Sequence, residues 1–600
     1  MDVGQAGWTN KRDPLTCSRR STIPNSNQQA KRVPATGRVA SQGVKMKRRL
    51  VGAALATVIL LAACGGNESG DGGGGEVKKG GILKVGTVDY IDSLNPFIAI
   101  ESQSYNAMVM QYPQLVQYGP GIKIEGDWAT DWSHSSDGLK WSFKLKPGAK
   151  WSDGKPMTAA DAAWTGNTIL EYADGPTSAL APALTNVKRF RAPDDETLII
   201  EYADATGNVL AQMEQFWILP EHVWSKYTGN DGKDIKTFQP EQDLPVVAGG
   251  AYSIDKYDKK GTTVFKPNPN FYGPEPNTDA VALIYYTNST SMIADLRAGT
   301  LDWIESVPAN AAEALESEPG ITVESELGAQ VDNITFNSNP VKPENRELLD
   351  PKVREALEYA TNRQELIDVV YNGYARPWAN LISSQSGEWV NPEIKPLPYD
   401  PDRANEILDS AGYKMRSGVR WAPATTGEFA QPAHPMSYEV IVPNSLNFNG
   451  ERYFEIVKDS WADVGVKLTL KPGGDTGQAY ALETAGGYTK FDLAIWDWVG
   501  YVDPDFMLSV MTKGQWYSWN DTGNNDPAYD AMYKKQGQTV DQEERRDLVW
   551  EMQAKLARER PYIHTVQEEI IMAFRDEWEG FYPQLGAYCK CYYTSPHLTQ

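Results

Sequence analysis

Cysteine and histidine are scarce in this chain of 600 residues, which contains four of the first and five of the second. Cys17 and Cys64 lie near the N-terminus, and Cys589 and Cys591 lie near the C-terminus. There is no CxxC pair and no histidine-rich tract, so the sequence predicts neither a structural zinc site nor another metal cofactor. Cys589 and Cys591 could oxidise outside the cytoplasm, although a bridge between residues i and i+2 strains the backbone.

Catalytic motifs are also missing. We find no GxSxG motif near a predicted strand, no GxxxxGK[ST] phosphate loop and no HExxH, so we expect neither enzymatic activity nor a cofactor. Carboxylates are plentiful, which leaves a glycosidase pair open on composition alone. Asp503 and Asp505 are separated by one residue, but this spacing does not mark a catalytic pair and favours solvated or helix-capping side chains. His564 lies in a strand-like stretch and is interpreted as a core or hinge residue rather than a base.

Positive charge is in deficit, since 57 basic residues face 79 acidic ones and the formal net charge is −22. A chain this acidic lacks the basic surface that neutralises phosphates, so we expect no nucleic-acid partner and no flat binding to anionic lipid. The hydrophobic fraction of 41 % is ordinary for a globular protein and excludes a disordered chain, a collagen and a multi-span membrane protein.

Residues 46–63 have the pattern of a signal peptide. Three basic residues precede an apolar run, Leu50 to Ala62, which is too short to span a bilayer as a helix. The run ends in Leu61-Ala62-Ala63-Cys64, which resembles a bacterial lipobox, so we expect Cys64 to be lipidated and to become the new N-terminus. Residues 1–45 carry eight Lys or Arg, two Asp and no apolar run. We interpret Met46 as the true start and residues 1–45 as no part of the protein.

Residues 64–81 are expected to form a lipidated cysteine followed by a flexible tether, because nine of residues 65–81 are Gly. A chain of this composition has a root-mean-square reach of roughly 20–25 Å. The sequence thus predicts a protein attached by its lipid alone to the outer face of the cytoplasmic membrane.

The remaining chain mixes predicted strands and helices and indicates an α/β or α+β fold. Trp141, Phe143 and Leu145 alternate with polar residues as in a half-buried strand, and Thr158 to Asp161 resembles a helix-capping sequence. Asp-Pro pairs at residues 350–351, 400–401 and 526–527 predict three further helix starts, because Asp caps free N–H groups and Pro suits the first turn. Residues 491–496 read as a buried strand that runs into a loop.

Several sequence blocks together resemble the extracytoplasmic solute-binding proteins of the peptide/nickel family, which are receptors of ABC importers. The stretch from Trp128 to Asp161, with Ser136-Asp137-Gly138 and Trp151-Ser152-Asp153-Gly154 inside it, is the most specific. The other blocks are Ser93-Leu94-Asn95-Pro96, Gly249-Gly250-Ala251-Tyr252, Asn270-Phe271-Tyr272-Gly273, Val353 to Arg363, and Ala411-Gly412-Tyr413. They span about residues 82 to 581.

The resemblance implies a two-lobed fold of the periplasmic-binding-protein type, class II, with an extra subdomain and a hinge. We expect residues 82–335 and 563–600 to form lobe I and residues 336–562 to form lobe II, with crossings near Val331–Phe336 and Tyr562–Val566. It also implies a monomer that binds a small solute, most commonly an oligopeptide, and hands it to ABC permease and ATPase subunits.

Two charged anchors of the dipeptide-binding relatives are absent from the matching positions. Those relatives have an acidic residue that pairs with the peptide amine, and the aligned residue here is Tyr501. They also have an arginine at the position that is Asn444 in this sequence. Either Asp497 replaces the acid or the ligand is not a short zwitterion. Trp496 and Trp498 either form a stacking wall for the solute or pack in the core.

Three functions stay open: a receptor for oligopeptides, a binding protein for an oligosaccharide or other neutral solute, and a lipid-anchored hydrolase. An enzyme would turn its ligand over, whereas a receptor would return it unchanged.

Overall fold

The computed structural model describes residues 78–99, 101–119, 123–444, 446, 448–581 and 591–599. The predictions for residues 1–45, the signal peptide, Cys64, most of the tether and Cys589 lie outside these residues, as does the side chain of Cys591. The description below concerns the compact unit that begins at Gly75. No helix in the described ranges is both long and apolar enough to cross a membrane.

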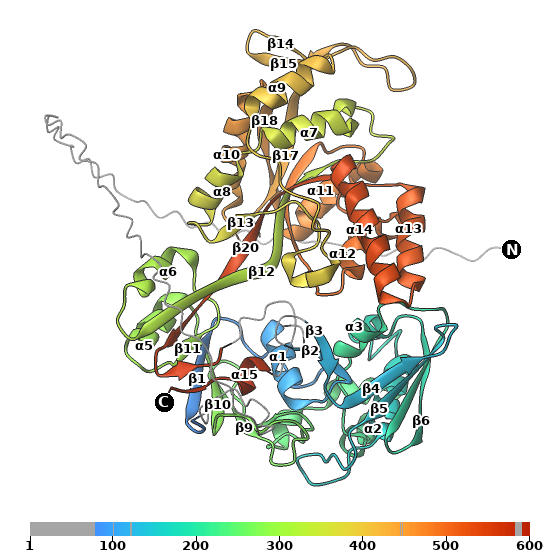
Figure 1. Ribbon diagram of the computed structural model, residues 1–600, viewed down its shortest axis with the longest axis vertical. Helices are drawn as coiled ribbons and strands as arrows, with labels where there is room; N and C mark the ends of the chain where they lie inside the picture. Colours follow the sequence, from blue (N-terminus) through green and yellow to red (C-terminus); the bar gives the residue numbers. More distant parts are fainter. Residues whose placement is uncertain are drawn as a thin grey trace, which may run out of the picture. The chain divides into compact units, whose positions relative to one another are not determined.

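A large mixed sheet forms the centre of this unit (Figure 1). Among the described residues it has eleven strands, ten of them in one row and one, β13 (Ala375–Pro377), paired with β20. The row runs β18 (Lys467–Gly474), β17 (Ser437–Pro443), β19 (Leu493–Val499), β12 (Ile321–Phe336), β20 (Tyr562–Arg575), β11 (Trp303–Ile304), β1 (Ile82–Thr87), β10 (Ala280–Tyr285), β9 (Thr262–Pro267), β8 (Tyr252–Lys256).

The long antiparallel strands β12 and β20 connect two lobes. The first half of β12 and the last half of β20 pair with each other beside β11, in lobe I. The second half of β12 pairs with β19 and with the start of β20, in lobe II. The register breaks between Leu327 and Val331, so this bulge marks the change from one lobe to the other. The predicted crossing segments lie just beyond the break, within the lobe II half.

Donors from lobe II satisfy the backbone carbonyls at the break. The carbonyl of Leu327 accepts from Gln385 Nε2 at 2.5 Å, and that of Gly328 accepts from Gln567 Nε2 at 2.5 Å. The carbonyl of Ala329 accepts from the N–H of Gly500 at 3.1 Å. Because these buried groups keep hydrogen bonds, the sheet can change partner here without unpaired backbone.

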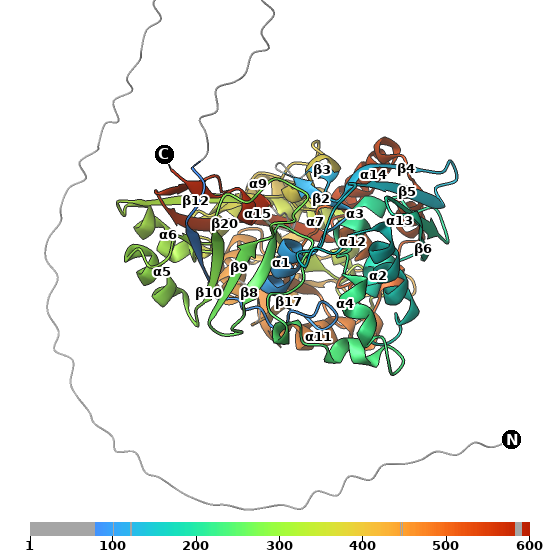
Figure 2. The same cartoon turned by 90° about the horizontal axis from the view of Figure 1, so that it is seen from below.

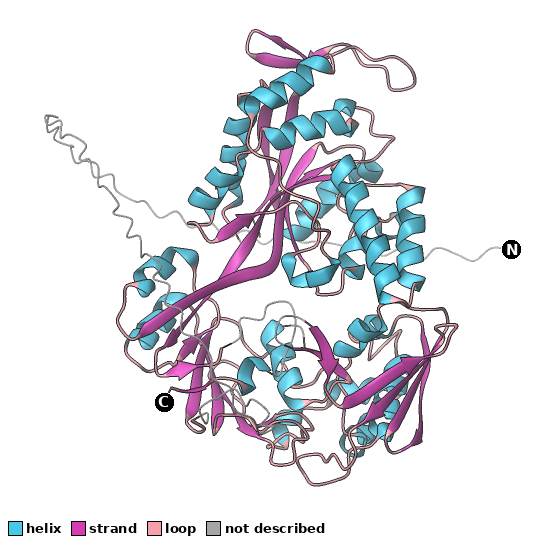
Figure 3. Ribbon diagram, viewed as in Figure 1, coloured by secondary structure: helices cyan, strands magenta, loops and turns pink. Residues whose placement is uncertain are grey.

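Helices cover the lobe II sheet on both faces, and helices and strands are mixed throughout the chain (Figure 3). The three predicted Asp-Pro helix starts are confirmed, since Asp350, Asp400 and Asp526 each accept a hydrogen bond from a backbone N–H of the first turn. The helices are α7 (Pro351–Tyr359), α8 (Arg363–Val370), α9 (Pro401–Ser410), α10 (Gly450–Ala462), α11 (Thr476–Tyr488), α12 (Asp505–Ser509), α13 (Pro527–Gln538) and α14 (Gln542–Glu559). A small sheet is formed by β14 (Lys414–Arg416), β15 (Val419–Ala422) and β16 (His434–Pro435).

Lobe I contains a separate four-stranded antiparallel sheet with its own core. Trp141, Phe143 and Leu145 are buried on β5, and Thr158 and Asp161 form a capping box on α2, as predicted. This subdomain consists of β4 (Ala129–His134), β5 (Lys140–Leu145), β6 (Val187–Asp194), β7 (Thr197–Tyr202), α2 (Ala159–Glu171), α3 (Val209–Glu214) and α4 (Glu221–Trp224).

The rest of lobe I packs around its half of the central sheet (Figure 2). Its elements are α1 (Ser102–Gln111), the hairpin β2 (Val116–Gly119) and β3 (Lys123–Gly126), α5 (Ser289–Arg297), α6 (Ala309–Glu316), α15 (Cys591–Thr594), and the pair β21 (Trp578–Glu579) and β22 (His597–Leu598).

Candidate binding cleft

A cleft of about 700 Å³ lies between the lobe I subdomain and lobe II. This volume falls in the range of known small-molecule sites. The lobe I wall is built mostly from amides and hydroxyls, whereas the lobe II wall follows β19 and α12 and carries several aromatic rings. The lobe I residues include Thr185, Asn186, Asp204, Thr206, Asn208, Gln212 and Gln215, and the lobe II residues include Tyr501, Asp503, Asp505, Phe506, Ser509, Gln515, Trp519, Tyr533 and Lys534.

Three aromatic rings form the core of the lobe II wall. Tyr501 lies edge-to-face against Phe506 with ring centroids 5.5 Å apart, and Phe506 lies edge-to-face against Trp519 at 5.6 Å. Tyr501 is 45 % exposed and Trp519 is 51 % exposed, although most tryptophans of this chain are buried. Rings held in place by each other and left open on one side can stack on a flat or apolar part of a solute.

Successive side chains of β19 point to opposite faces of the sheet, so Trp496 and Trp498 lie on one face and Asp497 lies on the other. Both tryptophans are only 8 % exposed and pack in a core under α12 and α14. Trp498 stands behind the wall, with its ring centroid 6.5 Å from that of Trp519. Asp497 points to the other face of the sheet, because successive side chains of a strand alternate. The structure thus brings Tyr501 to the cleft surface and places the two tryptophans beneath it.

Asp497 belongs to a group of three carboxyls on neighbouring strands. It is the cross-strand partner of Asp332, and Gln330 Nε2 donates to both Asp332 Oδ1 and Glu568 Oε1 at 3.0 Å. The hydroxyl of Tyr371 donates to Asp332 Oδ2. Within the described residues none of the three carboxyls is balanced by a cation.

Burial raises the pKa of all three carboxyls. The pKa of Asp497 rises to about 6, and that of Glu568 rises to about 7 because of burial and of the nearby Asp497. The pKa of the fully buried Asp332 is raised strongly, by burial first and by Glu568 second. Two residues beyond Asp497 on the same face, Val499 is 54 % exposed, so this face opens to solvent at its end.

Asn444 lies away from the cleft. It follows β17, is exposed, and its N–H donates to the carbonyl of Gly474 at 2.8 Å. Its position in a binding site stays a prediction.

Asp503 and Asp505 hold the cleft wall together. Arg545 is fully buried and donates to both carboxylate oxygens of Asp503, at 2.6 and 2.7 Å. Asp505 accepts from Gln536 Nε2 at 2.6 Å and from the hydroxyl of Tyr533 at 3.1 Å. These bonds occupy both carboxylates, so the pair positions the loop that carries Tyr501 and Phe506.

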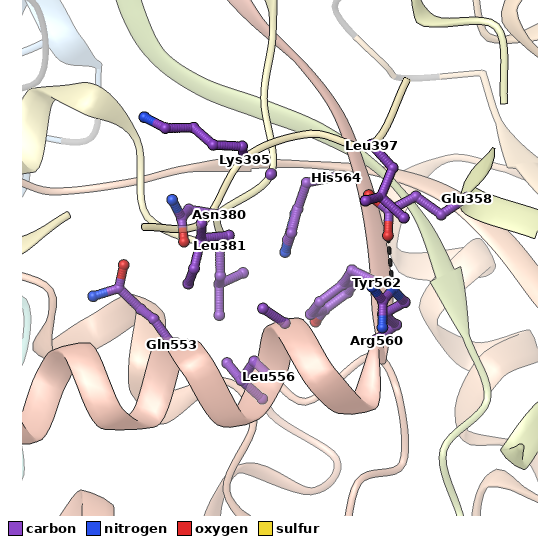
Figure 4. Close-up of a pocket in the computed structure, with 13 residues that line it drawn as sticks. Glu358, Asn380, Leu381, Lys395, Leu397, Gln553, Leu556, Arg560, Tyr562 and His564 are labelled. Carbon is purple, nitrogen blue, oxygen red and sulfur yellow. Dashed lines mark hydrogen bonds and ion pairs between the residues drawn. The ribbon is translucent and has the colours of Figure 1, made fainter. Parts of the chain in front are cut away.

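A second, smaller cavity of about 60 Å³ lies inside lobe II (Figure 4). His564 points into it from β20, and Arg560 Nε donates to Glu358 Oε2 at 2.7 Å at its rim. Burial, together with the nearby Arg363, lowers the pKa of His564 to about 3, so the imidazole is neutral. The space suits a few water molecules rather than a solute, and His564 is a buried strand residue as the sequence indicated.

Sequence reasoning missed Phe506, Trp519 and the lobe I wall. The run Trp516-Tyr517-Ser518-Trp519 is an aromatic signal that could have pointed to the wall, but no local pattern marks the amides of residues 185–215. Across the described residues no group of three His, Cys, Asp or Glu side chains is arranged to hold a metal ion.

The two lobes and the cleft between them define a solute-binding protein, and comparison with known proteins assigns its family. Residues 123–541 match the model of the bacterial extracellular solute-binding proteins, family 5 (middle region). The chain therefore belongs to this family. Its members are binding receptors without enzymatic activity, which removes the hydrolase from the three alternatives.

Curated relatives share about a quarter of their residues with this chain. The glutathione-binding protein GsiB of Pectobacterium atrosepticum is 25 % identical over 517 residues, which cover 84 % of this chain and 91 % of the relative. Heme-binding protein A of Haemophilus influenzae is 25 % identical over 490 residues, covering 78 % and 84 %. A Brucella ovis protein named for ABC-transporter peptide binding is 27 % identical over 349 residues. That match covers 57 % of this chain, which spans 62 % of the length of the Brucella protein.

Solved structures confirm the predicted fold. HbpA2 from Haemophilus parasuis has a TM-score of 0.72 at 18 % identity and covers 87 % of this chain and 100 % of its own. The unliganded open form of the murein tripeptide-binding protein MppA has a TM-score of 0.70 at 19 % identity, covering 87 % and 98 %. DppA from Helicobacter pylori in complex with the peptide STSA has a TM-score of 0.63 at 22 % identity, covering 87 % and 99 %. The fold is thus the two-lobed α/β fold of this family.

Proposed function

We propose that this protein is a lipid-anchored receptor of an ABC importer, which captures oligopeptides by closure of its two lobes. It would deliver them to a permease driven by ATPase subunits, as a monomer tethered through Cys64 outside the cytoplasmic membrane. The single observation that carries the proposal is the cleft between lobes, in which three ordered aromatic rings face a wall of amides and hydroxyls.

The walls suit the chemistry of an extended peptide. Amide and hydroxyl side chains can donate to and accept from peptide bonds of any sequence, whereas Tyr501 and Trp519 can cover apolar side chains. GsiB is named for glutathione binding, and DppA from Helicobacter pylori was solved in complex with the peptide STSA, which supports the same class of solute. For the peptide amine we propose Asp497, which does not line this cleft but lies on the other face of β19, because it is half-buried and has no cation partner among the described residues.

A neutral solute such as an oligosaccharide is the second candidate. The exposed faces of Tyr501 and Trp519 favour it, since aromatic rings stack on sugar faces as readily as on side chains. This solute would make no use of the charge of Asp497, which gives the two candidates different responses to one substitution.

Isothermal titration calorimetry of wild type and Asp497→Asn against two pools tests the choice. One pool contains tri- to pentapeptides, and the other contains cello- and xylo-oligosaccharides. If the carboxylate holds the amine, Asp497→Asn should weaken peptide binding by roughly 1.5–3 kcal/mol, whereas a sugar should lose roughly 0.5–1.5 kcal/mol. Asp131→Asn is the matched control, because it removes the same charge from an exposed position on β4 that does not line the cleft.

The outcomes separate the proposals. Equal peptide binding by wild type and Asp497→Asn would remove Asp497 as the anchor. Binding of sugars alone would replace the oligopeptide proposal by the second candidate.

The lipid anchor has its own test. Cys64→Ser should give an unprocessed or unlipidated protein, because serine cannot accept the thioether-linked lipid. Mass spectrometry and detergent partitioning of the mature protein would measure this. A wild-type product that starts elsewhere and carries no acyl mass would contradict the anchor.

A further inference from the structure

The turn between α13 and α14, residues 539–541, reaches from lobe II to the lobe I subdomain. The N–H of Gly207, just before α3, donates to the carbonyl of Gly537 at 2.9 Å. In return, Gln542 Nε2 donates to the carbonyl of Gly207 at 3.1 Å. Both views place the ends of α13 and α14 beside α3, β4 and β5 (Figures 1 and 2). This contact joins the lobes at a place remote from β12 and β20.

Glycines on lobe I leave just enough room for this turn. A Cβ on Gly207 would lie 2.3 Å from the carbonyl oxygen of Thr539, closer than real Cβ contacts. The φ of Gly207 is not in the left-handed region, so close approach, and not backbone conformation, requires glycine here. A Cβ on Gly138 would lie 2.6 Å from Cγ2 of Val540, which packs against the hydrophobic core of the lobe I subdomain.

The lobe II side of this contact is fixed to the cleft wall. Arg545 Nε donates to Gln536 Oε1 at 3.0 Å while its other nitrogens hold Asp503. Gln536 also donates to Asp505, at the start of the helix that carries Phe506. One buried network therefore connects the turn at residues 539–541 with the aromatic rings that face the cleft.

We propose that the α13–α14 turn is a latch, in which Val540 packs at Gly138 and the Thr539 carbonyl lies against Gly207, and which holds lobe I against lobe II once the cleft has closed. The inference rests on the proposed capture by lobe closure and adds to it a device that slows reopening. The Arg545 network joins α12 to the latch. A solute that contacts Phe506 on α12 would therefore also position the turn at residues 539–541 for its contact with lobe I.

Gly207→Ala and Gly537→Ala form a matched pair for the test. Each adds one methyl group at a residue of the same hydrogen bond, but a Cβ on Gly537 meets nothing within 4 Å. Because Gly537 lines the cleft, calorimetry of Gly537→Ala with the peptide pool accompanies the exchange measurement. Hydrogen–deuterium exchange of the intact chain is read in peptides that cover residues 203–209 and 536–542, without solute and with the tri- to pentapeptide pool. Val540→Ala is a second variant, which removes the packing at Gly138 without a clash.

The latch predicts that Gly207→Ala speeds exchange in both segments by roughly tenfold, and that Gly537→Ala, which replaces a helical glycine, exchanges no faster than wild type. The peptide pool should slow exchange in both segments of wild type and of Gly537→Ala, but not of Gly207→Ala. Val540→Ala should speed exchange in the same segments as Gly207→Ala, by a smaller factor. Equal exchange in wild type and Gly207→Ala would overturn the latch. So would equal protection with and without a pool that calorimetry shows to bind, because the contact would then be permanent.

Failure of the proposed function would look different. If calorimetry detects no binding of the peptide pool, the oligopeptide proposal falls. The two glycine variants then decide the latch alone, since their effect on exchange needs no solute.

Discussion

The two faces of β19 differ in what they do although their residues are neighbours in sequence. Trp496 and Trp498 face a core beneath the cleft wall, and their burial stabilises lobe II. Asp497 faces the opposite way, beside two further carboxyls that no cation balances in the described residues. One face of β19 therefore supports the site, while the other keeps an unfavourable group of carboxyls that a cationic solute could relieve.

The largest effect should come from the face of β19 that packs under the cleft wall. Trp498→Ala should lower the free energy of unfolding by about 3–5 kcal/mol, because it removes a large buried ring from a packed core. Trp519→Ala, which changes an exposed ring of the same wall, should stay within about 0.5 kcal/mol of wild type. Urea denaturation of the three proteins measures both changes. Similar losses for the two variants would show that Trp519 is part of the core.

The carboxyl face should make stability depend on pH. Asp497 and Glu568 have pKa values of about 6 and about 7 in the folded chain, above their ordinary values of 3.8 and 4.5. The folded state therefore binds more protons, and stability falls as the pH rises from about 4 through 7. At about 1.4 kcal/mol per pKa unit, the two raised pKa values correspond to a loss of at most about 6 kcal/mol. Urea denaturation at pH 5 and pH 8 measures the loss.

Asp332→Asn is the control for this pH effect. It keeps the side-chain shape and removes one charge from the group, so the loss between pH 5 and pH 8 should shrink. An unchanged loss in Asp332→Asn would place its origin in other groups of the chain.

Solute binding should also report on the carboxyl face. If Asp497 holds a peptide amine, the affinity for the peptide pool should fall by roughly tenfold from pH 7.5 to pH 5, because the carboxylate must be ionised to pair with the amine. Calorimetry at the two pH values measures this, with Asp497→Asn as the variant in which the change should disappear. A pH-independent affinity in wild type would exclude the carboxylate from the contact.

Local patterns predicted the elements better than the site. Three helix starts could be predicted at Asp350, Asp400 and Asp526, because a cap needs only adjacent residues. The strand β5 could be predicted from the period of two of Trp141, Phe143 and Leu145. Family-wide blocks gave the fold, which the solved structures confirm.

The cleft could be predicted only in part because it forms between distant segments. Tyr501 was found from the loop after β19, but Trp519 reaches it through contacts with Phe506, and the amides of residues 185–215 join it only when the lobes meet. The predicted strand ends at residue 496, whereas β19 continues to Val499, so the alternation that separates Asp497 from Trp496 and Trp498 lies beyond the predicted end. Arg545 gave no local sign that it holds Asp503, 42 residues away.

Solute binding in the cleft between the lobes can be measured by calorimetry of wild type and Trp519→Ala. Stacking contacts are worth about 0.5–1.5 kcal/mol beyond burial, so we predict that whichever pool binds wild type will bind Trp519→Ala roughly three- to tenfold more weakly. Tyr517→Ala is the control, because Tyr517 is 63 % exposed two residues away but does not line the cleft. Equal affinity for wild type and Trp519→Ala, or an equal loss in both variants, would contradict a solute site at this cleft.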